Sequence, residues 1–236
     1  MTVVRTLFFY LCFIIAAVVA LIPCFFLSLL PASARYDNKA YFFFMYLFYR
    51  ISLFGTLLPI TIIGNENISD DGSIVVANHQ SALDVALIGA LLKYKPHLWL
   101  FKKELRKIPF YGIMANRMNI AVDRDSPRKS LASLLEGIRL IRGTSRTLII
   151  FPEGGRYADG KIHEFLWGFA IIARKTGFPV TPIVIKDAYK VYPAGSFFMN
   201  YHPVTVIIGK PFVLQADESD EQFIQRIYTW FVDQEG

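Results

Sequence analysis

Cysteine is nearly absent from this sequence of 236 residues, and the two that occur, Cys12 and Cys24, both lie near the amino terminus. If one helix carries both, they are about 18 Å apart along its axis, too far for a disulfide bond. Beyond residue 24 the chain contains no cysteine. The sequence therefore predicts neither a disulfide-stabilised scaffold nor an enzyme with a catalytic thiol.

The usual spacings of metal-binding and nucleotide-binding motifs are also missing. The histidines fit neither H-x3-H nor H-E-x-x-H, and the chain has no Walker loop and no G-x-G-x-x-G sequence. We therefore expect no bound metal and no nucleotide cofactor.

Charge is sparse in the first quarter of the chain. The net charge is +6, but residues 1–63 hold only four of the 25 Lys and Arg residues and one of the 19 Asp and Glu residues. The remainder, with 21 basic and 18 acidic residues, carries a net charge of +3. This mild excess and the lack of a recognised motif argue against nucleic acid as a partner. Attraction to an anionic membrane surface accounts for the balance.

Two long apolar runs occupy this uncharged part. Residues 6–34 contain no charged side chain, and the run is long enough to cross a bilayer. The second run, residues 41–63, has Arg50 as its one charged residue and is rich in Phe and Tyr, which favour the headgroup zone. The first run is about twice as long as a signal-peptide core, although ASA at 32–34 resembles a cleavage site. We expect residues 1–63 to be a retained two-helix membrane anchor, either a spanning hairpin or a partly inserted pair.

From residue 64 onward, strand-like and helix-like segments alternate. Short apolar runs predict strands at 73–77, 98–101, 120–122, 147–151, 180–185 and 204–208. Helices are predicted at 82–92, 103–108, 127–142, 166–176 and 218–232. This alternation predicts an α/β domain over residues 64–236, with a mixed, mostly parallel sheet covered by helices.

The most informative motif follows the first of these strands. Residues 78–84 read NHQSALD, which places His79 in the turn after a buried strand and Asp84 in the first turn of the next helix. Here a histidine can act as a general base, while a carboxylate fixes its tautomer and stabilises the imidazolium. His79 and Asp84 are therefore the candidate catalytic pair. Ser81 and Asp84 also fit the S-x-x-D capping pattern, in which Asp84 is structural.

Three further segments place polar side chains next to predicted strands. Lys102 begins the sequence KKEL, residues 118–124 read MNIAVDR, and residues 151–156 read FPEGGR. The glycines allow close approach of a ligand, the arginine offers a planar fork to phosphate, and the glutamate can accept hydrogen bonds from hydroxyl groups. Each segment also has a simpler interpretation, either a tight turn with a surface ion pair or, for Lys102, an exposed Lys-Lys-Glu surface.

In this order, the segments resemble the glycerophospholipid acyltransferase family, and within it the bacterial 1-acyl-sn-glycerol-3-phosphate acyltransferases. Residues 78–84 match the family's His-x4-Asp motif. Its second, third and fourth blocks match residues 118–124, residues 151–156 and the sequence PVTPI at 179–183. The His-x4-Asp spacing alone is weak evidence, whereas four blocks in sequence are strong. The resemblance extends from the apolar N-terminal pair to about residue 213.

Three places depart from the family pattern. Gly155 stands where the third block usually has Thr, and Met118 stands where the second block usually begins with Gly. Leu166 and Trp167 occupy the place of a lysine that often precedes Gly168. The missing cation weakens the case for a bare phosphomonoester acceptor and leaves room for a lysolipid with another head group.

The resemblance implies transfer of a fatty acyl group from acyl-CoA or acyl-carrier protein to the sn-2 hydroxyl of 1-acyl-glycerol-3-phosphate, which gives phosphatidic acid. It implies His79 as general base assisted by Asp84, no cofactor, and the bilayer as a partner. The expected location is the bacterial inner membrane, with the catalytic domain on the cytoplasmic side. The residues expected to hold the lysophospholipid acceptor are Lys102, Arg124, Glu153, Gly154 and Arg156. Two other functions remain open: acyl transfer to another lysolipid, such as a lyso-aminolipid, and a catalytically silent, membrane-anchored lipid-binding protein.

Overall fold

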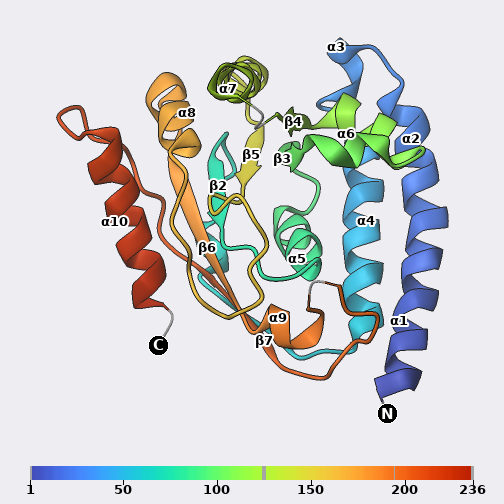
Figure 1. Ribbon diagram of the computed structural model, residues 1–236. Helices are drawn as coiled ribbons and strands as arrows, with labels where there is room; N and C mark the ends of the chain where they lie inside the picture. Colours follow the sequence, from blue (N-terminus) through green and yellow to red (C-terminus); the bar gives the residue numbers. More distant parts are fainter. Residues whose placement is uncertain (1, 124–125, 194, 235–236) are drawn as a thin grey trace.

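The computed structural model describes residues 2–123, 126–193 and 195–234, and a seven-stranded sheet lies at its centre (Figure 1). The strand order is β1-β7-β6-β2-β5-β3-β4. The strands are β1 (Ile60–Ile63), β2 (Ile74–Ala77), β3 (His97–Lys102), β4 (Ile120–Val122), β5 (Thr147–Ile150), β6 (Val180–Lys186) and β7 (Val204–Ile208). Their short apolar runs are typical of strands that are covered on both faces.

The strand directions bring five strand ends to one edge of the sheet. β6, β2, β5, β3 and β4 are parallel to one another, whereas β7 pairs antiparallel with β6 and parallel with β1. In the register, Val75 of β2 lies opposite Ile149 of β5 and Thr181 of β6. The mixed, mostly parallel sheet confirms the fold class predicted from the sequence. Loops at the carboxyl edge of such a sheet are the usual place for a site.

Helices cover both faces of the sheet (Figure 1). One face packs against α7 (Pro127–Ile141), α8 (Gly168–Thr176) and α10 (Asp220–Asp233), and the other packs against α5 (Leu83–Leu92). Alternate strand residues serve the two cores, so that Ile74 and Val76 enter the first while Val75 and Ala77 enter the second. The smaller elements are α3 (Ala32–Arg35), η2 (Asn65–Asn67), η3 (Lys103–Lys107), α6 (Tyr111–Met118) and α9 (Ala188–Val191).

The amino-terminal apolar run forms one long helix, made of α1 (Thr2–Ala16), a π-helical turn η1 (Ala17–Leu21) and α2 (Ile22–Ser28). Within the described residues, this is the one helix long and apolar enough to cross a membrane. Helix α4 (Lys39–Thr56) runs beside it (Figure 1). The long helix exposes an apolar stripe with a spacing of three or four residues, formed by Val4, Leu7, Leu11, Ile14, Val18, Ile22 and Phe26.

Both ends of the long helix are hydrogen-bonded to the α/β domain. Near its start, Thr6 Oγ1 accepts from the Met199 backbone N–H at 3.0 Å, and the Tyr10 hydroxyl donates to the Phe197 carbonyl at 3.1 Å. At its far end, Arg117 of α6 donates to the carbonyl of Ser28 at 2.7 Å. The helix is therefore fixed along the side of the domain over nearly its whole length.

Two glycines allow α4 to pack between the long helix and α5. A Cβ on Gly55 would lie 2.6 Å from the Cβ of Cys12, and a Cβ on Gly89 would overlap the ring of Tyr49. Any larger residue at either position would push these helices apart. The close packing makes α4 a shared layer between the apolar helix and the sheet.

Three segments differ from the sequence prediction. Residues 60–63, which hydropathy assigns to the end of the second apolar membrane segment, form β1 and pair with β7. The helix predicted at 103–108 is a 3₁₀ segment, η3, and the sequence does not predict α6. A four-residue apolar strand has the composition of a membrane-helix end, so hydropathy does not separate the two. Pro109 interrupts the helical pattern just before α6 and hides its start.

His97, at the start of β3, gives the fold a dependence on pH. Its side chain is buried among rings, 5.1 Å from Phe42 and 6.1 Å from Tyr49 between centroids. Burial lowers the pKa of His97 from 6.5 to about 4, although its hydrogen bond to the Lys95 carbonyl opposes the shift. Between these two pH values the unfolded chain binds a proton that the folded chain does not. Stability is therefore present in full above about pH 6.5 and is lost as pH falls toward 4.

We expect the free energy of unfolding to fall by up to about 3 kcal/mol through this residue between pH 7 and pH 4. A His97→Gln variant should show a shallower decline of Tm over this range than the unaltered protein. Thermal unfolding at pH 7.5, 6.0, 5.0 and 4.5 measures both curves. Parallel curves for the two proteins would contradict the role of His97.

Candidate active site

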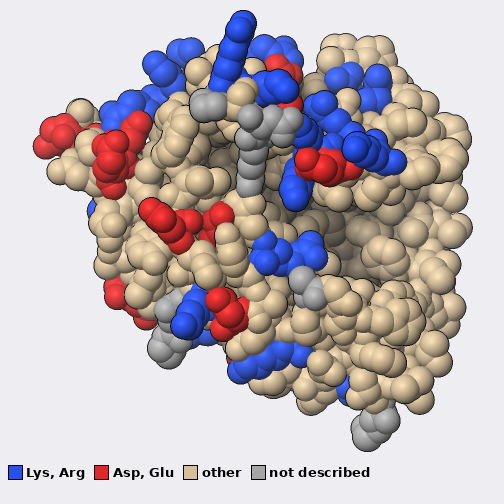
Figure 2. All heavy atoms as spheres, viewed as in Figure 1, with Lys and Arg blue, Asp and Glu red and all other residues tan. Residues whose placement is uncertain are grey.

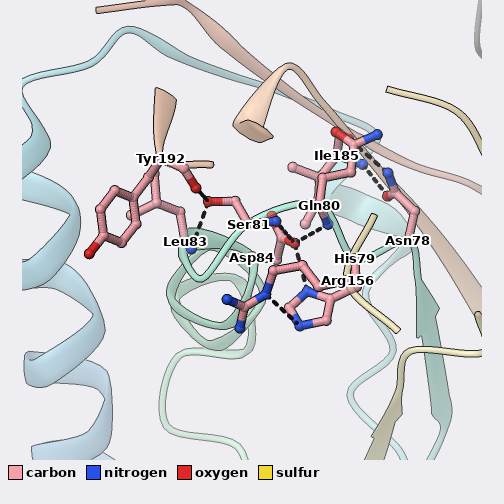
Figure 3. A network of polar contacts seen from close by, with 9 residues as sticks. All are labelled: Asn78, His79, Gln80, Ser81, Leu83, Asp84, Arg156, Ile185 and Tyr192. Carbon is pink, nitrogen blue, oxygen red and sulfur yellow. Dashed lines mark hydrogen bonds and ion pairs between the residues drawn. The ribbon is translucent and has the colours of Figure 1, made fainter. Parts of the chain in front are cut away.

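His79 and Asp84 meet at the carboxyl edge of the sheet, in the turn between β2 and α5 (Figure 3). His79 Nδ1 lies 2.8 Å from Asp84 Oδ2. The Asp84 side chain is fully buried, whereas 15% of the His79 side chain is exposed. A buried carboxylate behind a partly exposed imidazole fixes the ring through Nδ1 and leaves Nε2 for chemistry.

The same carboxylate oxygen also holds the turn together. The backbone N–H groups of Gln80 and Ser81 donate to Asp84 Oδ2 at 2.7 and 2.8 Å. The capping interpretation and the catalytic interpretation of Asp84 are therefore compatible, because one oxygen serves both. Any change at Asp84 affects the backbone of the turn as well as the imidazole.

Side-chain hydrogen bonds from the neighbouring residues position this turn on the sheet. Asn78 accepts from the Ile185 backbone N–H at 2.8 Å and donates to the Ile185 carbonyl at 2.9 Å. Its amide thus extends the β2–β6 ladder by one residue beyond β2 (Figure 3). The Ser81 hydroxyl donates to the Tyr192 carbonyl at 2.8 Å, which ties the turn to the segment after α9. The loop after β5 adds a fourth tie, since the Tyr157 N–H donates to the His79 carbonyl at 2.9 Å.

Two side chains after β5 complete the surroundings of the imidazole. The Phe151 ring stacks on His79 with centroids 4.0 Å apart and planes inclined by 12°. Arg156 Nε donates a long hydrogen bond of 3.4 Å to His79 Nε2 (Figure 3). An arginine is always a donor, so Nε2 is the acceptor and Nδ1 carries the proton that faces Asp84. This is the tautomer in which Nε2 can take up a proton from a substrate.

The imidazole opens into a cavity of about 420 Å³, which we call the base cavity. Most of its walls are apolar and come from the N-terminal helices, β3 and α6, including Leu21, Met45, Phe48, Tyr49, Trp99, Phe101, Tyr111 and Met114. The cations Lys102 and Arg156 also line it. Figure 2 shows a hollow on this face with Lys and Arg side chains gathered at its rim, next to a broad flank that is almost free of charge. The cavity thus combines a long apolar wall, a histidine and two positive charges.

The residues predicted from the sequence fall into three groups. His79, Lys102, Gly154 and Arg156 line the base cavity, and Asp84 lies behind His79. Glu153 is buried, with 6% of its surface exposed, and is not among the residues of the cavity wall that the structure describes. Arg124 lies outside the described residues. Within residues 2–123, 126–193 and 195–234, no three His, Cys, Asp or Glu side chains are grouped as metal ligands.

Several residues that form the site could not be identified from local sequence patterns. Phe151 belongs to the FPEGGR segment, but its stacking on His79 depends on the β2–β5 pairing, which the sequence does not specify. Asn78 lies beside His79 in the motif and is polar at the end of an apolar strand, which could have marked it as a residue that fixes the turn. Tyr49 and Phe48 belong to a run that hydropathy assigns to the membrane anchor, although they line the base cavity.

The chain matches a known family over more than half of its length. The family model described as Acyltransferase matches residues 59–186. That segment runs from the start of β1 to the end of β6 and includes His79, Asp84 and Arg156. It therefore covers the five parallel strands and the site at their carboxyl edge.

Curated relatives and a solved structure agree with this match. A 1-acyl-sn-glycerol-3-phosphate acyltransferase of Cocos nucifera is 32% identical over 182 residues, covering 74% of this chain and 57% of that protein. One of Pseudomonas aeruginosa is 28% identical over 212 residues, covering 87% and 79%. The chain spans only 52–57% of the length of the first plant relatives it matches. The crystal structure of the 1-acyl-sn-glycerophosphate acyltransferase PlsC of Thermotoga maritima superposes with a TM-score of 0.80 at 27% identity, covering 99% of this chain and 94% of that one. The resemblance found in the sequence is confirmed, and the chain belongs to the acyltransferase family.

Proposed function

We propose that this protein is a membrane-bound 1-acylglycerol-3-phosphate O-acyltransferase, which uses His79 as general base and Asp84 as its partner. One observation carries the proposal. His79 Nε2 faces a cavity with a long apolar wall, while its Nδ1 is held at 2.8 Å by the buried carboxylate of Asp84. A fatty acyl chain fits the apolar wall, and an alcohol that enters from the charged rim meets the base.

In the proposed reaction, the sn-2 hydroxyl oxygen of the acceptor attacks the carbonyl carbon of the acyl thioester. His79 Nε2 takes the hydroxyl proton as the C–O bond forms, and Asp84 stabilises the resulting imidazolium. The tetrahedral intermediate then collapses, the C–S bond breaks, and the imidazolium returns the proton to the departing thiolate. The products are an ester and a free thiol, and the enzyme ends in the protonation state in which it began.

Positive charge at the rim supports a phosphate-bearing acceptor. Arg156 and Lys102 line the base cavity, and Arg156 reaches the reactive nitrogen itself. An acceptor hydroxyl that binds at Nε2 must replace the hydrogen bond from Arg156. A phosphate on the same acceptor offers the guanidinium a stronger, bidentate partner and draws it away from the base. Arg124 is proposed as a further phosphate ligand from the family pattern, and Glu153 and Gly154 as the support of the glycerol side.

The attachment of the apolar helix favours insertion into one leaflet over a membrane-spanning hairpin. Thr6 and Ser28, which are both bonded to the α/β domain, lie about 33 Å apart along the helix, close to the hydrocarbon thickness of a bilayer. If the helix crossed the membrane, the α/β domain beside it would be drawn into the hydrocarbon. We therefore propose that the apolar stripe lies in one leaflet of the bacterial inner membrane, with the active site at the cytoplasmic surface.

The proposal is tested by thiol release from an acyl thioester with a panel of lysolipid acceptors in vesicles. We expect 1-acyl-glycerol-3-phosphate to give the highest kcat/KM, about tenfold or more above lysophospholipids with larger head groups, because one good charge-assisted contact is worth that much. Co-sedimentation with the same vesicles checks membrane association. A preference for a lyso-aminolipid or another lysolipid would transfer the assignment to that acceptor. Absence of turnover with every acceptor would leave a silent lipid-binding protein.

A further inference from the structure

A second cavity lies on the opposite side of the catalytic turn. It has a volume of about 350 Å³, and we call it the β6 cavity because it opens at the carboxyl end of β6. Asn78 and Gln80 line it, while His79 between them faces the base cavity. The rest of its wall comes from the loop after β5 and from the end of β6 with α9, and it includes Lys186, Asp187 and Lys190. The mechanism described above gives this cavity no role.

The order of strands gives the two cavities different positions along the edge of the sheet. The carboxyl ends follow the sequence β6, β2, β5, β3, β4, with the catalytic turn after β2. Arg156 follows β5 and Lys102 ends β3, so the cations proposed for the acceptor lie on one side of His79. The β6 cavity lies on the other side. A thioester carbonyl at His79 therefore has the acceptor on one flank and the β6 cavity on the other.

Gln80 supplies an independent sign that the β6 cavity receives a polar ligand. Only 3% of its surface is exposed, and its Oε1 has no hydrogen-bond partner within the described part of the chain. Its backbone N–H is bonded to Asp84 Oδ2 at 2.7 Å, which fixes the residue directly beside the catalytic pair. Buried amide oxygens are nearly always paired, so this one is suited to accept an N–H from a ligand.

The charged side chains of the β6 cavity suit an anion. Lys186 and Lys190 line it together with Asp187, so these three residues carry a net charge of +1. Lys190 is exposed, and its Nζ lies 2.8 Å from Asp187 Oδ1. A phosphodiester or a pyrophosphate is such an anion and can accept hydrogen bonds from these ammonium groups.

From these observations we infer that the β6 cavity binds the 4′-phosphopantetheine arm of the acyl donor, with a pantetheine amide on Gln80 and the phosphate of the arm on Lys186 and Lys190. This assignment rests on the proposed acyltransferase function and extends it to the donor. The three arms of the tetrahedral intermediate then have separate places. The acyl chain lies along the apolar wall of the base cavity, the acceptor lies at Arg156, and the sulfur points toward the β6 cavity. When the C–S bond breaks, the thiolate takes the proton from His79 and the arm leaves as a free thiol.

The inference is tested with full-length protein in lipid–detergent micelles that carries Lys186→Gln and Lys190→Gln together. We expect the KM for acyl-CoA to rise about tenfold through loss of the contacts to the phosphate of the arm. The KM for the lysolipid acceptor should stay within about twofold. An acyl-N-acetylcysteamine thioester lacks the phosphate, so with this donor the variant and the unaltered protein should have kcat/KM values within about twofold of each other. Acyl-carrier protein carries the same arm as acyl-CoA and should show the same loss.

Controls separate this site from a general loss of charge. Lys175→Gln removes an exposed lysine of α8 at the opposite end of β6 and should leave all constants unchanged. Lys190→Gln alone, at an exposed position, should give an intermediate rise in KM for acyl-CoA if the double variant folds poorly.

Three results would overturn the inference: an unchanged KM for acyl-CoA, an equal loss with the truncated donor, or a loss confined to acyl-CoA. The last would assign the lysines to its nucleotide. If the unaltered protein turns over no acceptor, the proposed function fails. Calorimetric titration with 4′-phosphopantetheine then tests separately whether the β6 cavity binds the arm. We expect binding to be about tenfold weaker in the double variant than in the unaltered protein.

Discussion

Replacing His79 with Ala is expected to lower kcat/KM for acyl transfer by about 10²–10⁴-fold, the range for removal of a positioned general base. The loss should appear mainly in kcat, because in the proposed reaction His79 contacts the acceptor proton rather than the lipid head group. Its Nε2 faces the base cavity, and its ring is held by Asp84 and Phe151. Thiol release from acyl-CoA with saturating acceptor measures the effect, and thermal unfolding confirms that the fold is kept.

His163 offers a matched control for this substitution. It also pairs with an aspartate, because its Nε2 lies 2.9 Å from Asp159 Oδ2, but both side chains are substantially exposed. His163→Ala should keep kcat/KM within about twofold. Turnover by His79→Ala at the level of His163→Ala would remove the proposed mechanism, whatever the acceptor.

Asp84→Asn and Asp84→Ala should both lose about 10³–10⁴-fold in kcat, but they should differ in stability. An asparagine with its amide oxygen in the place of Asp84 Oδ2 still accepts from His79 Nδ1 but carries no negative charge to stabilise the imidazolium. It still offers an oxygen to the N–H groups of Gln80 and Ser81, which bond to Asp84 Oδ2 at 2.7 and 2.8 Å. Alanine leaves these buried donors unpaired, which costs about 1–3 kcal/mol. Thiol release and thermal unfolding measure the two effects side by side.

The alanine variant is therefore expected to be less stable than the asparagine variant. For a protein of this size, the loss corresponds to a Tm lowered by roughly 2–12 °C. Asp159→Asn makes the same chemical change at the exposed His163 pair and should alter neither activity nor Tm. Equal melting temperatures for Asp84→Ala and Asp84→Asn would show that the backbone hydrogen bonds to Asp84 do not support the turn.

The central part of the site could be predicted because its signals are local. His79 and Asp84 lie five residues apart across one strand–turn–helix junction, so their meeting depends on a single turn. The strands β2 to β6 were recognisable for a similar reason, since each is a short apolar run next to a polar loop. Arg156 and Lys102 follow other strands, but parallel pairing brings the ends of those strands to the same edge.

The remainder depends on contacts between distant segments. β1 has the composition of a membrane segment, and only its pairing with β7 distinguishes it from one. Phe151 reaches His79 only because β5 lies next to β2 in the sheet. Glu153 is buried by the packing of the loop after β5, which the sequence does not specify. Its carboxylate predicted a contact with a ligand, but Glu153 is not among the described residues that line the base cavity. The β6 cavity is formed by three separate segments, and no single one of them predicts it.

The position of α4 has a consequence for any attempt to make a soluble form of the enzyme. Part of the wall around His79 is formed by four residues of this helix, Tyr41, Met45, Phe48 and Tyr49. Tyr49 packs closely against α5 because Gly89 has no side chain. Deleting the chain up to the end of α4 would therefore remove one wall of the base cavity together with the proposed membrane anchor. The proposed membrane contact of α1 and α2 and the cavity wall of α4 belong to one packed helical layer, so a truncation cannot remove the first without damaging the second.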